Sequence, residues 1–374
     1  MAVGLLVQSP QSIRAGILAL MAPMMAFADG SPQKVWEVRL SDKLVEPAGW
    51  SAPKGHPIIE LAFSPDGKKI AATMDDHRQG GVWRTHLLIV DVQNPQSLFH
   101  QFDLETCGND VAWSPDGGAL LVCGRILRLD DGSSCDLAPM RNIAFPGVLG
   151  SHSFWLNADR VIRSDRTIAD LSCRWVDTWE IAGGWDVADT LPEKGWMLLR
   201  QSVKRTAANG GTFLFPDYAI ANRDSHRLTS GPLVQAADLS RNTMIAPGAG
   251  AVCSSLIPAG RSVLHCWNLP GGEVISLAPN LTDYLVTQAS RSSPRIVAER
   301  WGSHWWELFD EVGYMASRIV VDLRSGRQIA SLKPRPQHGY FPVSHDWYFR
   351  CALSPAGDLL AEGGDGSLTL YRLP

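Results

Sequence analysis

The chain has 374 residues, of which 45% are hydrophobic and 19% charged, and its formal net charge is −4 at pH 7. This composition is that of an ordinary soluble globular protein. Lys and Arg form no clustered run, and because a nucleic-acid-binding surface shows a clustered basic face, we do not expect nucleic acid as a partner. The 34 Gly and 24 Pro residues favour a turn-rich β protein.

The first segment of the chain has the pattern of an export signal. Arg14 precedes an apolar run that ends in Ala26-Phe27-Ala28. The run is shorter than the ~20 apolar residues of a membrane-spanning helix, and a small-residue exit of this kind is typical of a cleaved signal. We predict a signal peptide at residues 1–28 and a mature domain at residues 29–374, exported to the periplasm or secreted. An uncleaved membrane anchor and a segment of the fold are the two alternatives.

A hairpin sequence recurs along the mature domain. Residues 59–73 read as two strands joined by Ser64-Pro65-Asp66-Gly67. Ser114-Pro115-Asp116-Gly117 and Ser354-Pro355-Ala356-Gly357 occur in the same setting. Pro presets the φ angle of such a turn, and Gly accepts the left-handed conformation that other residues resist. Each copy therefore indicates a β-hairpin.

Weaker copies of the hairpin can be placed by register. They lie at residues 154–162, 187–199, 237–246 and 290–298, with the seven turns near positions 64, 114, 156, 191, 239, 290 and 354. Third and fourth strands follow the hairpins, as at residues 86–92, 270–277, 318–323 and 324–332. Units of four antiparallel strands, spaced around ~40–45 residues, are typical of propeller blades.

The sequence therefore predicts an all-β fold made of a single seven-bladed β-propeller, with six or eight blades as alternatives. The last unit offers only three strands within residues 348–372, and an unassigned strand precedes the first unit at residues 34–40. If this N-terminal strand completes the last blade, the ring closes and its sheet edges are protected. No stretch has helical periodicity over several turns.

Residues 61–71, Leu-Ala-Phe-Ser-Pro-Asp-Gly-Lys-Lys-Ile-Ala, together with Leu88-Ile89-Val90-Asp91, resemble the WD40-like repeat of the TolB and PD40 type. Related hairpins occur in WD40 propellers and in the propeller domains of prolyl-oligopeptidase-like proteins. The chain differs from these families: no unit has a Gly-His start with a Trp-Asp end, there is no separate N-terminal domain as in TolB, and no Gly-x-Ser-x-Gly hydrolase motif occurs. The resemblance implies a propeller used for binding, and it assigns no catalytic residue.

Propeller geometry sorts the connections onto two faces. The first-to-second and third-to-fourth turns of each unit share one face, which we name the turn face. The second-to-third connections and the links between units share the other, which we name the loop face. The long loops at residues 50–56, 75–84, 301–311 and 337–348 belong to the loop face, and we expect the aromatic residues at 175–180 and 183–186 to join it. Loops on a rigid scaffold often carry function.

The loop face is rich in aromatic and His residues, which suit contact with a protein or a small ligand. The candidate binding residues are Trp50, His56, His77, Trp83, Trp185, Trp301, His304, Trp305, Trp306, His338, Tyr340, His345 and Trp347. Two other interpretations stay open: the aromatics cap the blade ends beneath their own loops, or the face holds an active site. We predict a monomeric, non-enzymatic binding module without a catalytic residue, metal or cofactor. The alternative is a propeller hydrolase, lactonase-like or glycan-acting, with its site at the mouth of the central channel.

All seven cysteines follow residue 28, and none forms a Cys-x-x-Cys motif. Export would allow disulfides, and the candidate pairs are Cys107–Cys123 and Cys253–Cys266. Buried free thiols are the alternative for both pairs. The sequence leaves Cys135, Cys173 and Cys351 unassigned, and an odd count leaves at least one thiol unpaired or intermolecular.

Overall fold

The structure is a computed structural model of the whole chain. It describes residues 31–43, 58–77, 83–105, 111–122, 124–137, 153–181, 183–206, 212–230, 239–257, 263–269, 273–275, 277, 281, 284–301, 315–333, 350–364 and 366–374.

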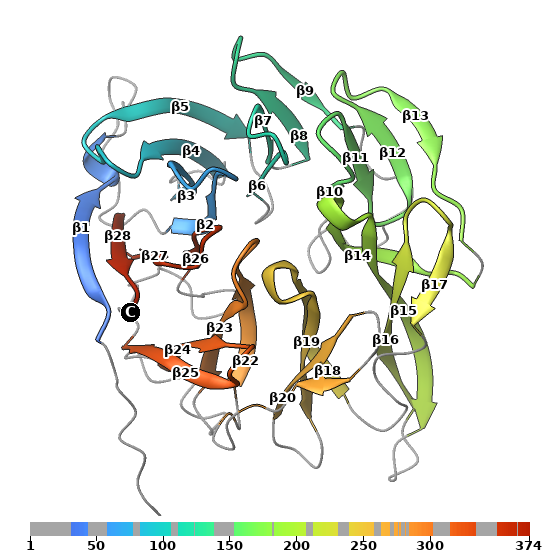
Figure 1. Cartoon of the computed structure of the whole chain (residues 1–374). Helices are drawn as coiled ribbons and strands as arrows, with labels where there is room; N and C mark the ends of the chain where they lie inside the picture. The colour runs from blue at the N-terminus through green and yellow to red at the C-terminus, as the bar shows by residue number, and fades with distance from the viewer. Residues whose placement is uncertain are drawn as a thin grey trace, which may run out of the picture.

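Seven antiparallel sheets of four strands each form a ring (Figure 1). We number these sheets as blades 1 to 7 in chain order. In six blades the four strands neighbour one another in chain order, and in the seventh the order is β26, β27, β28 and β1. The predicted seven-bladed all-β propeller is confirmed. Among the described residues, the helical structure consists of three short 3₁₀ turns, and no helix is long and apolar enough to cross a membrane.

The strands of blades 1 to 4 have the following bounds. Blade 1 consists of β2 (Ile58–Phe63), β3 (Lys69–His77), β4 (Trp83–Asp91) and β5 (Leu98–Glu105). Blade 2 consists of β6 (Val111–Trp113), β7 (Ala119–Val122), β8 (Arg125–Arg128) and β9 (Ser134–Asp136). Blade 3 consists of β10 (Ser153–Trp155), β11 (Arg160–Arg163), β12 (Thr167–Asp170) and β13 (Trp175–Thr178). Blade 4 consists of β14 (Asp186–Leu191), β15 (Trp196–Thr206), β16 (Thr212–Asn222) and β17 (Arg227–Ser230).

The remaining blades complete the ring. Blade 5 consists of β18 (Leu239–Ala246), β19 (Ala251–Ile257), β20 (Val263–Asn268) and β21 (Val274–Ile275). Blade 6 consists of β22 (Tyr284–Ala289), β23 (Arg295–Trp301), β24 (Met315–Asp322) and β25 (Arg327–Leu332). Blade 7 consists of β26 (Cys351–Leu353), β27 (Leu359–Gly363), β28 (Ser367–Arg372) and β1 (Gln33–Arg39).

The first strands of the blades form the inner wall of the ring. Each contacts the first strand of the next blade, from β2 through β6, β10, β14, β18, β22 and β26, and β26 contacts β2 again. The N-terminal strand β1 pairs antiparallel with β28 and so supplies the fourth strand of blade 7. The predicted closure by this strand is confirmed.

One predicted hairpin is wrong. Residues 237–246 were expected to contain the first turn of blade 5 near position 239, but residues 239–246 form the single strand β18. The turn is the 3₁₀ segment Pro247–Ala249, followed by Gly250 with φ of 61°. The Pro and Gly of this turn have the same roles as in the other hairpins. The polar residues 240–242 resemble a turn in sequence, but they lie within the strand β18.

Ser-Pro-Asp-Gly sequences form the turns through a repeated set of hydrogen bonds. Ser64 Oγ donates to Asp66 Oδ1 over 2.6 Å, and Oδ1 also accepts from the Lys68 amide over 3.1 Å. The hydroxyl of Ser64 thereby holds the pKa of Asp66 below its usual value. In blade 7 the Asp is replaced by Ala356, and Ser354 Oγ donates instead to Asp358 over 2.8 Å. The turn therefore persists where its sequence signature is incomplete.

Neighbouring blades are joined by buried apolar clusters and by indole hydrogen bonds. Trp113 is 2% exposed, and its Nε1 donates to Ala62 O of blade 1 over 2.9 Å. Trp155 is 3% exposed, and its Nε1 donates to Ala112 O of blade 2 over 3.0 Å. Each Trp thus buries a large apolar surface while its one polar group is satisfied by the adjacent blade. This accounts structurally for two of the 14 Trp residues.

Candidate functional site

The structure describes few of the candidate binding residues. The following lie outside the described residues: Trp50, His56, His304, Trp305, Trp306, His338, Tyr340, His345 and Trp347. Cys107 and Cys123, the first candidate disulfide, also lie outside them. These predictions stay predictions.

The described strands that flank the loop-face segments have their ends at the same face of the ring. Because successive strands in each blade run antiparallel, every second strand ends, and every third strand begins, at the same face of the ring. His77 is the last residue of β3 and lies opposite Trp83, the first residue of β4, in the strand register. Trp301 ends β23 in blade 6. These three candidate positions therefore lie at the loop-face ends of their strands.

Trp185 is partly buried against the protein interior. It lies in the link between blades 3 and 4, is only partly exposed, and packs against the cluster that contains Leu156, Val187 and Leu199. A Cβ atom at Gly183 would lie 3.0 Å from Trp185 Nε1, so the ring also covers the preceding turn. For this residue the capping interpretation fits the geometry better than a role in binding.

The aromatic residues at 175–180 do not form a loop. Residues Trp175–Thr178 are the outermost strand β13 of blade 3, and all four are exposed. Trp175 is 40% exposed and Val176 48%. The guanidinium carbon of Arg163 lies 5.0 Å from the centre of the Trp175 ring, within cation–π range. Trp179 is instead buried, with its Nε1 donating to Arg223 O of blade 4 over 2.9 Å. The expectation that residues 175–178 join the loop face is wrong.

Asp189 is a carboxylate on the inner wall that the sequence did not single out. It lies at an irregularity in the pairing of β14, where the register shifts between Val187 and Asp189. Its Oδ2 accepts from the amide of Ile245 in blade 5 over 3.3 Å, and its Oδ1 from the amide of Thr190 over 2.8 Å. Although the residue keeps some solvent contact, burial raises the pKa of Asp189 to about 6, against the opposing effects of these amides and of Arg291.

The turn face adds charged groups near the axis. Arg291, in the first turn of blade 6, forms an ion pair with Glu193 in the first turn of blade 4, with 3.6 Å between Nη1 and Oε1. The pair spans the turn of blade 5. Both side chains are partly exposed, at 34% and 48%, so the pair contributes little to stability.

A buried ionic cluster joins blades 6 and 7. Arg318 has no exposed side-chain surface, and its guanidinium contacts Glu299 of blade 6 and Glu362 of blade 7. Desolvation acts against its charge, but the neighbouring acidic groups keep the pKa of Arg318 above its ordinary value. Cys351 Sγ lies 3.7 Å from Glu299 Oε1, and burial strongly raises the pKa of this thiol. A buried neutral thiol is a poor nucleophile, so the cluster has the chemistry of a structural core.

Two disulfides occur in the described part of the chain. Cys253 and Cys266 lie directly opposite each other on β19 and β20 and form one. Cys135 and Cys173, which the sequence left unassigned, form the other, with 5.9 Å between their Cα atoms. Cys351 is a buried free thiol. No sequence signal pairs Cys135 with Cys173, because they are 38 residues apart and belong to different blades.

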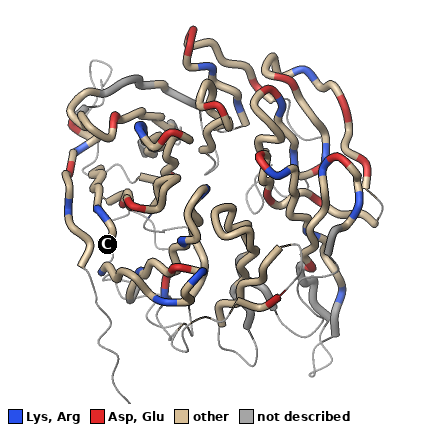
Figure 2. The backbone as a smooth tube through the Cα atoms, in the orientation of Figure 1, with Lys and Arg blue, Asp and Glu red and all other residues tan. Residues whose placement is uncertain are grey.

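The described surface has mixed charge. Figure 2 shows Lys and Arg interspersed with Asp and Glu around the ring. In the part of the chain that the structure describes, no three His, Cys, Asp or Glu side chains are grouped so that they could hold a metal ion.

No family model matches the sequence, and no curated protein matches it. Solved structures do match the fold. A chain in the crystal structure of a mitotic checkpoint complex aligns with a TM-score of 0.53 and 13% sequence identity, covering 98% of this chain and 99% of that chain. At this identity the likeness shows the fold alone. The closer resemblance to TolB and PD40 repeats stays a prediction.

Proposed function

We propose that this protein is an exported, non-catalytic β-propeller that binds a protein partner or a small ligand through its loop face. The propeller fold suits a protein-interaction module in general. The observation that carries the proposal is the common direction of the described strand ends at residues 77, 83 and 301. These strand ends all lie at the loop face of the closed ring, and we propose that the aromatic and His-rich sequences next to them bind the partner there.

The rigidity of the ring supports this role. The first strands contact one another all the way round, and indole, hydroxyl and guanidinium groups bond to carbonyl oxygens of adjacent blades. A scaffold held in this way loses little conformational entropy when its loops bind a partner.

The disulfides support export. Disulfides persist in oxidising compartments and are rare in the cytosol of most organisms. The two pairs Cys135–Cys173 and Cys253–Cys266 involve cysteines that all follow the predicted signal peptide. This support is independent of the N-terminal sequence pattern.

Partner capture tests the binding proposal. The mature chain, its Trp305→Ala/Trp306→Ala variant and a turn-face control, Lys68→Ala, would each be used as bait in the exported fraction, after their melting temperatures have been shown to agree. Lys68 is a suitable control because its side chain is 73% exposed and lies in the first turn of blade 1. We expect the loop-face variant to lose captured partners that the control retains. Retention of every partner by the loop-face variant would place the site elsewhere.

Export has its own test. N-terminal sequencing of the protein recovered outside the cytoplasm should begin at Asp29. Recovery of the intact chain from the cytoplasm alone would overturn this part of the proposal without affecting the binding part.

One observation favours the hydrolase alternative. Asp189 lies on the inner wall with its pKa raised to about 6, and raised carboxyl pKa values are frequent in active sites. Its oxygens, however, already accept from two backbone amides, which gives it a role in joining blades 4 and 5. Esters, lactones and glycosides would be tested with wild type and Asp189→Asn. Turnover by wild type that is lost in Asp189→Asn would favour the enzyme.

A further inference from the structure

We propose that the disulfide Cys135–Cys173 is a redox-operated clasp, which a dithiol reductant opens selectively to release the outer seam between blades 2 and 3 while the ring stays closed. The proposal rests on the described disulfides alone and does not depend on the proposed binding function.

The two disulfides differ in what they connect. Cys135 lies on β9, the outermost strand of blade 2, and Cys173 lies in the turn between β12 and β13 of blade 3. This disulfide crosses from one blade to the next. Cys253 and Cys266 instead lie on the neighbouring strands β19 and β20 of blade 5, which pair along six register positions. Only the first disulfide joins elements that no strand pairing holds together.

They also differ in accessibility. Cys253 and Cys266 are each 0% exposed, inside the core cluster between blades 5 and 6. Cys135 and Cys173 are both partly exposed. Thiol–disulfide exchange requires the attacking thiolate to reach a sulfur atom, so access favours reduction of Cys135–Cys173.

The clasp joins two blades whose strands are all short. Every strand of blades 2 and 3 has three or four residues, whereas β15 and β16 of blade 4 have 11 each. Short ladders make few hydrogen bonds, so the outer strands of these blades open at low free energy when nothing else ties them. Closer to the axis, Trp155 Nε1 donates to Ala112 O, and Trp155 belongs to a buried apolar cluster with Leu121 and Val161. This inner contact explains why opening the clasp leaves the ring closed.

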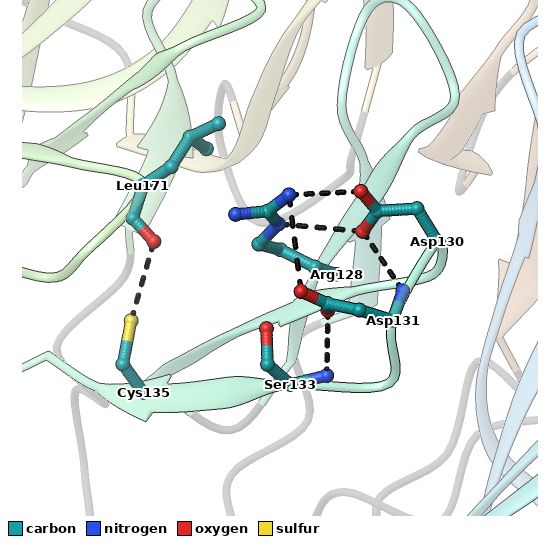
Figure 3. A network of polar contacts seen from close by, with 6 residues as sticks. All are labelled: Arg128, Asp130, Asp131, Ser133, Cys135 and Leu171. Atoms are coloured by element: carbon teal, nitrogen blue, oxygen red, sulfur yellow. Dashed lines mark hydrogen bonds and ion pairs between the residues drawn. The ribbon is translucent and has the colours of Figure 1, made fainter.

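The turns on the two sides of the seam respond differently. Figure 3 shows that Arg128 contacts Asp130 and Asp131 and that the Asp131 carboxylate accepts from the Ser133 amide, all within the β8–β9 turn of blade 2. This turn keeps its own contacts after reduction. On the other side, the Asp170 carboxylate likewise accepts from the amides of Ser172 and Arg174. The two turns differ in that Cys173 has a φ of 58°, a conformation that costs free energy for a non-Gly residue. We therefore expect the larger change in blade 3, at residues 171–178.

The dithiol supplies the electrons and protons for the reduction. Two successive exchanges transfer two electrons to the Cys135 and Cys173 sulfurs, the two dithiol protons end on these sulfurs, and the reductant becomes a cyclic disulfide. The Cys135 sulfur lies 3.5 Å from Leu171 O (Figure 3). In the disulfide this sulfur carries no hydrogen. After reduction the Cys135 thiol can donate to the Leu171 carbonyl, so the new S–H group has an acceptor.

Opening the clasp affects an exposed apolar strand. Trp175 and Val176, at 40% and 48% exposure, follow Cys173 within three residues. Reduction removes the covalent tie beside the end of β13 that carries both side chains. The clasp therefore controls how rigidly the largest exposed aromatic side chain of the described surface is presented.

Differential alkylation tests selectivity. The folded mature chain would be incubated with graded dithiothreitol, and free thiols would be labelled and identified by peptide mass spectrometry. We expect Cys135 and Cys173 to become labelled at dithiol concentrations at least tenfold lower than Cys253 and Cys266. Equal labelling of both pairs, or earlier labelling of Cys253 and Cys266, would overturn the proposal.

Hydrogen exchange tests the structural response. At the selective dithiol concentration, amide exchange in residues 134–137 and 171–178 should accelerate at least tenfold, with no change in residues 351–372 of the closing blade. The double variant Cys135→Ala/Cys173→Ala should show the fast exchange without reductant, and Cys253→Ala/Cys266→Ala is the matched control that should not. Because reduction of the wild type gives the same readout, the test does not require either variant to fold. Unchanged exchange in blades 2 and 3 after selective reduction would show that the bond is not a clasp.

Discussion

Arg318 of blade 6 donates a hydrogen bond to Glu362 of blade 7 over 2.6 Å, in a place where neither side chain has more than 1% of its surface exposed. Arg318 Nε donates at the same time to Glu299 of its own blade over 2.7 Å. A single guanidinium therefore binds two carboxylates inside the protein and joins the closing blade to its neighbour. Removing one member of such a cluster is destabilising, because the remaining buried charge loses its partner.

Replacing Arg318 with Met should destabilise the protein by about 3–5 kcal/mol, because two carboxylates would remain buried without a cation. Urea unfolding would measure the loss. Arg324→Met, at an exposed position in the adjacent turn, is the matched control and should change stability by less than about 0.5 kcal/mol. Adding Glu299→Leu and Glu362→Leu to Arg318→Met should recover much of the lost stability. A single variant as stable as the control would contradict the role given to the cluster.

Asp189 should make part of the stability depend on pH. Its carboxyl has a pKa of about 6 in the folded protein, against an ordinary value of 3.8, so the folded state binds the proton more tightly. Stability contributed by this group therefore rises as pH falls from about 6 to 4, and it is reduced above pH 6. The unfolding free energy differs between pH 4 and pH 7 by on the order of 2 kcal/mol. This is less than the full pKa shift corresponds to, because the residue keeps some solvent contact.

The comparison with Asp189→Asn isolates this effect. Asn has no charge to desolvate, and its side-chain oxygen can still accept from an amide. The wild-type minus variant difference in unfolding free energy, measured from pH 4 to 8, should fall as pH rises from about 4 to about 6 and then level off. Carboxylates with lowered pKa values, such as Asp66 and Asp116, act in the opposite direction but are common to both proteins. A difference that does not vary with pH would refute the prediction.

Gly67 and Gly357 occupy the same place in the turns of blades 1 and 7, with φ of 72° and 74°. Ala at either position adopts a left-handed conformation at a cost of about 1–2 kcal/mol. At Gly67 the added Cβ would lie 3.6 Å from Pro355 Cδ, an ordinary contact, whereas at Gly357 it would lie 2.3 Å from Ser293 Oγ. Gly357→Ala should therefore be the more destabilising variant in thermal unfolding, and Gly357→Ala/Ser293→Gly should return it to the level of Gly67→Ala. Equal losses in the two single variants would show that the contact with Ser293 relaxes freely.

The closing strand β1 and the residue after it depend on their buried side chains. Leu40 is 0% exposed and packs in the cluster shared by blades 7 and 1, while Val35 of β1 is 45% exposed. Leu40→Ala should cost about 2–5 kcal/mol, and Val35→Ala should cost less than about 0.5 kcal/mol. Hydrogen exchange in β28, the partner of β1, would report the loosening. Equal exchange of β28 in both variants would mean that backbone pairing alone closes the ring.

Much of the fold could be predicted from local sequence chemistry. Pro and Gly at Pro65 and Gly67 require a turn of known geometry, and apolar residues on both sides require strands, so repetition of the hairpin gives the blade. The same reasoning failed at residues 237–246, where a first strand without strong alternation resembles a polar turn. The position of the N-terminal strand followed from a missing hydrogen-bond partner in the last blade, although the two strands lie at opposite ends of the chain, with Gln33 opposite Arg372.

The candidate site was less predictable, because its features depend on contacts between distant blades. The sequence by itself determined the blade repeat and the two faces, since both follow from backbone turns and strand pairing within a few tens of residues. It also determined the closing strand, because the last unit lacks a fourth strand and the N-terminal strand lacks a blade. Only the tertiary structure decided that Trp185 packs against a core cluster, that Arg318 lies between two carboxylates and that Cys135 meets Cys173. These facts follow from how neighbouring blades pack, and packing brings together residues whose spacing along the chain carries no signal of their contact.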